Sequence, residues 1–161
     1  MKRHLSIGMR HWPLPEDVDW CSVDVLLRLV NPLAVPPWEG VECVIEPAEV
    51  LQAVRMDCLR PWDAELLTRE HHIERIAWFV VNGWTDTIEL DIGAPDLGWT
   101  AGWPIQDGNH RFAAAIVRGD SLVATGFSGS LDYGEEIGLL VSSKTNVLHI
   151  TPGEWREPHA A

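Results

Sequence analysis

The sequence predicts one mixed α+β domain. Short segments with helical periodicity alternate with short segments in which apolar and polar residues alternate, and two of the latter are spaced as a hairpin. The chain has 161 residues, 46% of them hydrophobic and 22% charged. It is therefore long enough for a packed core and too apolar to be disordered throughout. We expect a mixed sheet with short helices, preceded by an N-terminal helical arm.

The arm is predicted from the first part of the chain. Residues 17–30 carry apolar side chains at helical spacing, with Asp17 as a cap, and the residues before them are expected to be a tail. Asn31-Pro32 and Pro36-Pro37 then mark a loop. We place the arm at residues 1–40 and the main domain, which ends in a strand and a polar tail, at residues 41–161.

The main domain is predicted to alternate strands and helices. A proline at a first turn favours a short helix, and Asn82-Gly83 supplies a left-handed stop for the longest one. In chain order, we expect a strand at 41–45, helices at 47–54 and 63–81, strands at 87–92 and 99–106 forming the hairpin, a helix that ends at Arg118, and strands at 122–127 and 137–142.

The charge balance narrows the range of partners. Twelve Lys and Arg stand against 24 Asp and Glu, which gives a formal net charge of -12. A protein that binds duplex DNA by neutralising phosphates needs a basic face, so the charge disfavours duplex DNA as a partner. A pocket for a nucleotide needs only two or three positive groups, so it is compatible with this charge.

No apolar run approaches the roughly 18 residues that span a bilayer, so we expect a cytoplasmic protein with no membrane contact.

Residues 107–111, Asp-Gly-Asn-His-Arg, carry the clearest chemical signal. They lie where a predicted strand turns into a predicted helix, and a helix N-terminus binds anions through unpaired N–H groups and the positive end of its dipole. Gly108 has no Cβ to keep a phosphate from the backbone, Arg111 can hold two phosphate oxygens, and His110 adds a donor. The same residues fit an ordinary helix start with Asp107 as N-cap. The spacing alone leaves both interpretations open.

The segment DGNHRFAAA resembles the ParB/sulfiredoxin-like superfamily. At the corresponding turn ParB partition proteins carry GERR, sulfiredoxins GGCHR and several ParB-like nuclease-domain proteins DGxHR. The similarity extends over residues 41–127, which include VECVIEPAEVL, a long helix ending in VVNGW, and the hairpin, in the order that the family uses.

The resemblance implies a mixed sheet of this type and a nucleotide site in which Gly108, His110 and Arg111 contact phosphates, with Asn109 between them. The expected ligands are ATP or another nucleoside triphosphate and Mg²⁺. Asn109 stands where sulfiredoxins carry the reactive cysteine, so sulfiredoxin chemistry is not expected. The segment after Phe127 reads as a strand and a tail, and not as the helix-turn-helix domain of the partition proteins.

The resemblance also implies that the loop before the long helix faces the nucleotide. Arg60 is then expected to assist a phosphate. One of four acids is expected to serve as a carboxylate base or to hold Mg²⁺, namely Asp57, Asp63, Glu65 or Asp107. Asp63 also fits the cap of the long helix. His71 and Glu74 share a helical face, yet with no companion ligand we expect them to be solvated surface and not a metal site.

These observations favour an Mg²⁺-dependent hydrolase or phosphotransferase that acts on a nucleoside triphosphate, mainly by positioning and charge neutralisation. One alternative is a ParB-like nuclease, or a plasmid- or phage-encoded inhibitor of DNA transfer, that acts on DNA. Another is a non-catalytic module, acidic and with nine tryptophans, that blocks a protein partner through charge and aromatic contacts.

Overall fold

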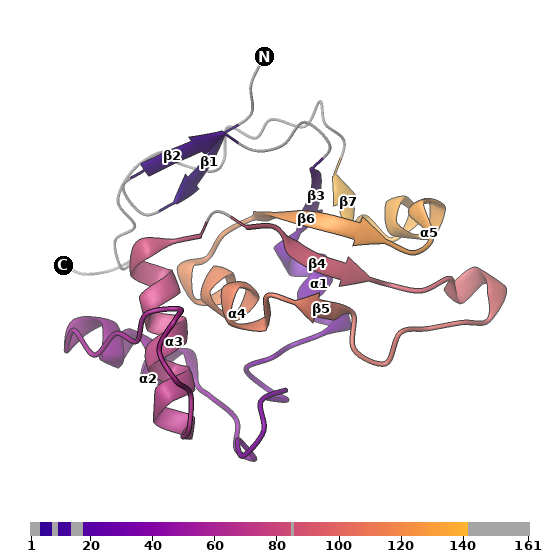
Figure 1. The fold of residues 1–161 in the computed structure, drawn as a ribbon. Coiled ribbons are helices and arrows are strands. Elements are labelled where there is room, and N and C mark those ends of the chain that lie inside the picture. The colour runs from indigo at the N-terminus through magenta and orange to yellow at the C-terminus, as the bar shows by residue number, and fades with distance from the viewer. Residues whose placement is uncertain (1–3, 8–9, 14–17, 85, 142–161) are drawn as a thin grey trace.

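The computed structural model describes residues 4–7, 10–13, 18–84 and 86–141. It has the mixed α+β architecture that the sequence predicts (Figure 1). In chain order the elements are β1 (His4–Ile7), β2 (Arg10–Pro13), β3 (Asp19–Ser22), α1 (Val23–Leu29), α2 (Pro47–Arg55), α3 (Arg69–Asn82), β4 (Ile88–Asp91), the 3-10 turn η1 (Pro95–Leu97), β5 (Ile105–Asp107), α4 (Asn109–Arg118), β6 (Leu122–Ser128), α5 (Leu131–Glu136) and β7 (Leu140–Val141).

Within the described residues the strands form a hairpin and a larger sheet. The hairpin pairs β1 with β2, and the five-stranded sheet has the order β5-β4-β6-β3-β7. β4 and β6 are parallel, and the other neighbours are antiparallel. Parallel neighbours require a crossover connection. Here the chain leaves β4 through the η1 hairpin and β5, and α4 then carries it back to β6.

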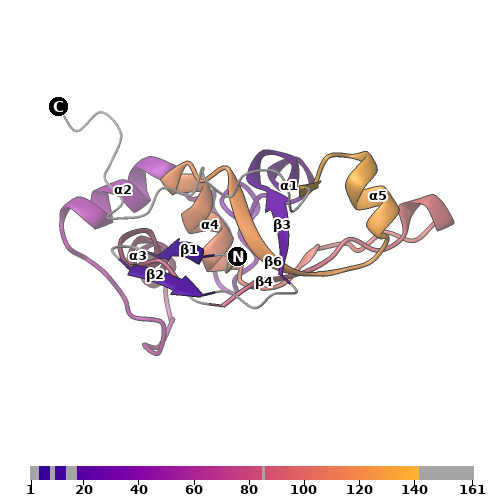
Figure 2. The same cartoon turned by 90° about the horizontal axis from the view of Figure 1, so that it is seen from above.

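The core lies between the sheet and α4, which in turn packs against α3. The four residues from Phe112 to Ala115 are fully buried, and the small alanines allow α4 to approach its neighbours closely. α3 buries Ile73, Ile76, Ala77 and Val80, a set with helical spacing. α2 and α3 lie side by side at one end of the molecule in both views (Figures 1 and 2). The start of α4 is thereby enclosed by the sheet on one side and α3 on the other.

The structure confirms the predicted elements whose ends are marked by a proline, a glycine or an alternating pattern in the sequence. α2 begins at Pro47, as the proline at its first turn predicts, and Glu46 and Glu49 form a reciprocal capping box there. α4 ends at Gly119, whose φ of 76° provides the left-handed stop. β4 and β6 lie within a residue or two of their expected positions.

The expected helix at 17–30 is shorter than predicted. Residues 19–22 form β3, an inner strand between β6 and β7, and only Val23–Leu29 is helical, with Ser22 as its N-cap. Trp20 and Cys21 are buried in the sheet. Because β3 pairs with a strand on each side, residues 19–22 are extended in spite of their helical pattern. Residues 19–29 of the expected arm therefore belong to the same sheet and core as the main domain. Asp17 lies outside the described residues, and the expected tail contributes the β1–β2 hairpin.

The predictions of a strand at 41–45 and of a helix beginning at residue 63 are wrong. The Val41 and Ile45 amides donate to carbonyls of the preceding loop, those of Trp38 and Leu33, and no strand among the described residues pairs with this segment. α3 begins only after Thr68, whose hydroxyl accepts from the His71 amide. The carbonyls of Ala64 and Glu65 accept from arginine side chains, which hold these residues in the loop before the helix.

Two further segments differ from expectation at the hairpin and near the end of the described chain. The returning strand β5 covers only Ile105–Asp107, and most of 99–104 is irregular. α5 was not predicted because Gly134 lowers its helical propensity. A Cβ at this glycine would come within 2.9 Å of the Phe127 side chain and 3.0 Å of the Leu140 side chain, so these side chains would have to shift. Within the described residues β7 covers Leu140–Val141, and the rest of the expected strand at 137–142 is not strand up to residue 139 and lies outside the described residues at 142.

The position of the α3 cap gives a test. Replacing Thr68 by Ala removes the acceptor for the His71 amide and should lower the free energy of unfolding by about 1 kcal/mol. Asp63→Ala, at the cap that the sequence suggested, should change it by less than about 0.5 kcal/mol, as an exposed substitution usually does. Urea denaturation followed by circular dichroism measures both. An unchanged free energy of unfolding in Thr68→Ala would contradict a cap at Thr68.

Candidate functional site

The turn between β5 and α4 is built around Gly108. Its φ of 106° is left-handed, and it is the N-cap of α4 without a side-chain cap. A Cβ on this residue would lie 3.2 Å from the Arg111 guanidinium carbon and 3.2 Å from Ile88. Glycine is required here both for the backbone conformation and because Arg111 folds back beneath the turn. Next to it, the Asn109 side-chain oxygen accepts from the Trp103 indole at 2.8 Å, which fixes the amide.

Arg111 is buried and holds the start of α4 to the sheet. Its Nη1 donates to the Thr87 carbonyl at 2.8 Å, and its Nη2 lies 3.2 Å from the Asp107 carboxylate. Asp107 is therefore an ion-pair partner and not the helix cap. Its side chain is 76% exposed, and such an ion pair contributes little to stability. An incoming anion can thus replace Asp107 at the guanidinium with little loss.

His110 joins α4 to α3 through a second histidine. His72 Nδ1 and His110 Nε2 are 2.9 Å apart, which is a hydrogen bond between the two imidazoles. The Trp38 indole stacks on both rings, with centroids 4.4 Å from His110 and 5.1 Å from His72. The loop at 31–46 thereby covers the pair. Residues far apart in the sequence meet here, so the local pattern around residue 110 did not reveal these contacts.

Both imidazoles are neutral at neutral pH. Burial lowers the pKa of His110 to about 3, with smaller contributions from His72, Arg75 and Arg111. Burial also lowers the pKa of His72, and Arg75 and His71 add to the effect. The sequence suggested His110 as a pH-dependent donor to phosphate. In the described structure the His110 ring is uncharged and is hydrogen-bonded to the His72 ring.

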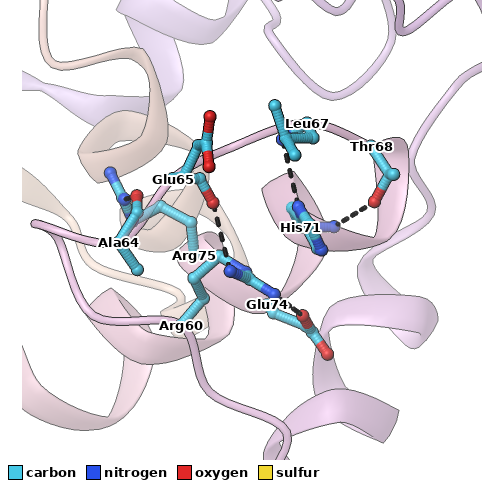
Figure 3. Close-up of polar contacts among 8 residues, drawn as sticks. All are labelled: Arg60, Ala64, Glu65, Leu67, Thr68, His71, Glu74 and Arg75. Carbon is cyan, nitrogen blue, oxygen red and sulfur yellow. Dashed lines mark hydrogen bonds and ion pairs between the residues drawn. The ribbon is translucent and has the colours of Figure 1, made fainter.

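Arg75 completes a cluster of nitrogen-bearing side chains, which we call the His–Arg cluster: His72, Arg75, His110 and Arg111. Arg75 is 7% exposed and donates from Nη2 to the Ala64 carbonyl (Figure 3), while its buried Nε has no hydrogen-bond partner in the described structure. Burial lowers its pKa. Among the described residues, the buried polar or charged side chains are those of His72, Arg75, Arg111 and Thr125. No carboxylate is among them.

The other predicted site residues lie on the connection between α2 and α3. Arg60 contacts Glu74 at 3.4 Å through two nitrogens and donates to the Glu65 carbonyl at 3.1 Å, so it braces the loop against α3 (Figure 3). Glu65 takes part through its backbone, and its side chain is exposed. Asp63 is exposed but close enough to Arg75 to favour its charged form. Asp57, also exposed, follows α2 with a left-handed φ of 55°.

His71 and Glu74 do not form a metal site with other described residues. The His71 ring accepts from the Leu67 amide at 3.0 Å, and Glu74 binds Arg60. No group of three or more metal-ligating side chains occurs in the part of the chain that the structure describes. The sequence predicted His71 to be solvated surface and gave no role to its neighbour His72, which is the histidine that lies in the site. The signal was present in the spacing, because His72 lies four residues from the buried Ile76, on the apolar face of α3.

The His72–His110 pair gives a prediction for the pH dependence of stability. In the unfolded chain both histidines titrate near 6.5, whereas the folded protein holds them neutral to lower pH. The unfolded state therefore binds more protons, and stability should be lost as pH falls from 6.5 toward about 3. His110→Phe keeps a ring against Trp38 but cannot titrate, so part of this loss should disappear.

Urea denaturation at a series of pH values measures the effect. His71→Phe, on the same helix, leaves both rings of the pair in place and should keep more of the wild-type pH dependence than His110→Phe does. Identical pH dependence in His110→Phe and wild type would contradict the assignment of two neutral, buried rings.

Comparison of the chain with protein-family models, with curated proteins and with solved structures found no match. No helix in the described residues combines the length and the apolar character needed to cross a membrane. The function of this protein must therefore be inferred from the residues that meet at the start of α4.

Proposed function

We propose that this protein binds a nucleoside triphosphate through its phosphates at the start of α4, as its resemblance to the ParB/sulfiredoxin-like superfamily implies. We propose further that it hydrolyses the nucleotide or transfers a phosphoryl group with Mg²⁺. The observation that carries the proposal is the His–Arg cluster. It gathers two arginines and two imidazoles where α4 begins, and no described buried carboxylate balances them.

The backbone at this turn supports an anionic ligand. The first intrahelical hydrogen bond of α4 runs from the Phe112 amide to the Gly108 carbonyl. The amides of residues 109–111 precede it and lie at the positive end of the helix dipole. The missing Cβ of Gly108 lets the Arg111 guanidinium lie against the turn, where its ion-pair partner, Asp107, is weak. These are the components of a phosphate cradle.

Magnesium fits this site as a ligand shared with the nucleotide. Mg²⁺ is commonly held by substrate phosphates, waters and only one or two protein carboxylates. Asp107 is exposed and adjacent to the turn, so it is the acid best placed for this role, and Asp63 beside Arg75 is the next. Asp57 and Glu65 also remain candidates. Catalysis would then depend on positioning and on neutralisation of charge by Arg111 and Arg75.

Nucleotide binding can be tested by thermal unfolding with ATP, ADP, CTP and GTP, each with and without Mg²⁺. A ligand at 100 times its Kd adds about 2.7 kcal/mol, which raises Tm by several degrees in a domain of this size. The shift should be lost in Arg111→Gln and reduced in Arg111→Lys. It should persist in Arg118→Gln, because Arg118 lies at the other end of α4, where it contacts Asp120 and Trp84.

The Tm of each variant without ligand is measured first, so that loss of the fold is distinguished from loss of binding. The absence of a shift with any nucleotide at millimolar concentration would overturn the proposal. An undiminished shift in a folded Arg111→Gln protein would place the nucleotide elsewhere.

A second candidate function, protein binding, is favoured by the tip of the β4–β5 hairpin. Leu97 is 84% exposed and Trp99 is 53% exposed. In both views η1 projects at the opposite end of the molecule from α2 and α3 (Figures 1 and 2). The Trp99 indole is held against Gly93, where a Cβ would lie 2.6 Å from the ring. A rigid exposed indole beside an exposed leucine is typical of an interface anchor.

Leu97→Asp separates this function from nucleotide binding. If the hairpin tip binds a protein, the substitution should remove that protein from pull-downs while the nucleotide-dependent Tm shift stays intact, because η1 lies far from the His–Arg cluster. Arg111→Gln should have the reverse effect. Retention of every captured protein by Leu97→Asp would contradict a role of the tip in binding.

A further inference from the structure

We propose that binding of a phosphoryl anion at the start of α4 is coupled to uptake of one proton by the His72–His110 pair, so that the affinity for the anion rises as pH falls. This inference rests on the proposed phosphate site and adds a regulation to it. It is carried by the hydrogen-bonded geometry of the two rings and by the charges that surround them.

The hydrogen bond defines where the proton is added. Two neutral imidazoles carry two N–H protons between them, and one of these lies in the bond between His72 Nδ1 and His110 Nε2. The ring that accepts this bond must carry its own proton on its outer nitrogen, and the ring that donates has a bare outer nitrogen. A proton from solvent adds to that lone pair and no hydrogen bond is lost. A second proton would set N–H against N–H and break the bond.

The charges around the pair explain why the first proton is absent without a ligand. Arg75 and His71 act on it from α3, and Arg111 acts from α4. Trp38, which covers the rings, carries no charge, and α2 contributes the apolar Val50 and Ala53 to the core. The acids Asp63 and Asp107 face Arg75 and Arg111, and both are exposed.

An anion at the turn reverses this balance. A phosphoryl group on Arg111 and the amides of α4 brings negative charge beside His110, which is the second residue of the helix. An opposite charge within about 4–6 Å favours the protonated form of an imidazole. The added proton then neutralises part of the ligand's charge. Each charge therefore lowers the free energy of placing the other.

Arg75 is a further donor beside the pair that an acceptor could satisfy. It is 7% exposed, and its Nε has no hydrogen-bond partner in the described structure. A buried unsatisfied donor is costly unless a ligand or a water meets it. Arg75 lies three residues after His72 and acts on both imidazoles. An anion that reaches the pair would also meet this arginine.

The test is isothermal titration calorimetry of the full chain in buffers with different ionisation enthalpies, which counts protons exchanged on binding. ATP tests the proposed site, and inorganic sulfate serves as an anion that does not titrate near neutral pH. At about pH 6.5 we expect uptake of up to about one proton with sulfate. The affinity should then rise by up to about tenfold for each unit of pH lost. His72→Phe should abolish most of the uptake, and His71→Phe should keep it.

The outcomes separate the two proposals. Binding of ATP or sulfate with no proton uptake by the protein overturns the coupling and leaves the phosphate site intact. Failure of both anions to bind overturns both. If the phenylalanine variants do not fold, the wild-type protein still decides the matter through NMR titration of its histidine rings. Sulfate should raise the pKa of His72 or His110, and an unchanged pKa in the presence of bound sulfate would refute the coupling.

Discussion

At Gly108 the backbone takes a conformation that only glycine adopts readily, and the absence of a Cβ lets the Arg111 side chain return beneath the turn. From there the guanidinium reaches the Thr87 carbonyl, just before β4. This bond fixes the first turn of α4 against the sheet. It also sets the rotation of the helix, so that His110 faces His72 on α3. The geometry of the whole site follows from this one turn.

The His–Arg cluster places two arginines in the protein interior with no buried acid beside them among the described residues. Arg75 and Arg111 are buried with backbone carbonyls of Ala64 and Thr87 as their main partners, and not with buried acids. Carbonyl oxygens satisfy N–H groups but do not neutralise charge, so the cations carry a cost of desolvation. The neutral state of the imidazoles limits that cost. A ligand with negative charge would remove more of it, which is why binding should stabilise the fold here in particular.

The sequence allowed the part of the site that depends on neighbouring residues to be predicted. The turn at Gly108, the helix that follows and its end at Gly119 all have local causes, and so does the start of α2 at Pro47. His72, Arg75 and Trp38 were missed because long-range packing brings them to His110. The start of α3 was placed too early, since nothing in the local pattern shows that arginine side chains take the carbonyls at 64 and 65.

β3 has the same dependence on distant residues, with a consequence for how the chain can fold. Its neighbours are β6 and β7, and the Thr125 hydroxyl donates to the Asp19 carbonyl across 106 residues of sequence. During synthesis, Trp20 and Cys21 must therefore remain without their final surroundings until β6 has emerged from the ribosome. Pairing over such separations slows folding and prolongs exposure of apolar segments. A fragment that stops before β6 would keep the sequence of the turn at Gly108 and yet lack the middle strand of the sheet that supports it.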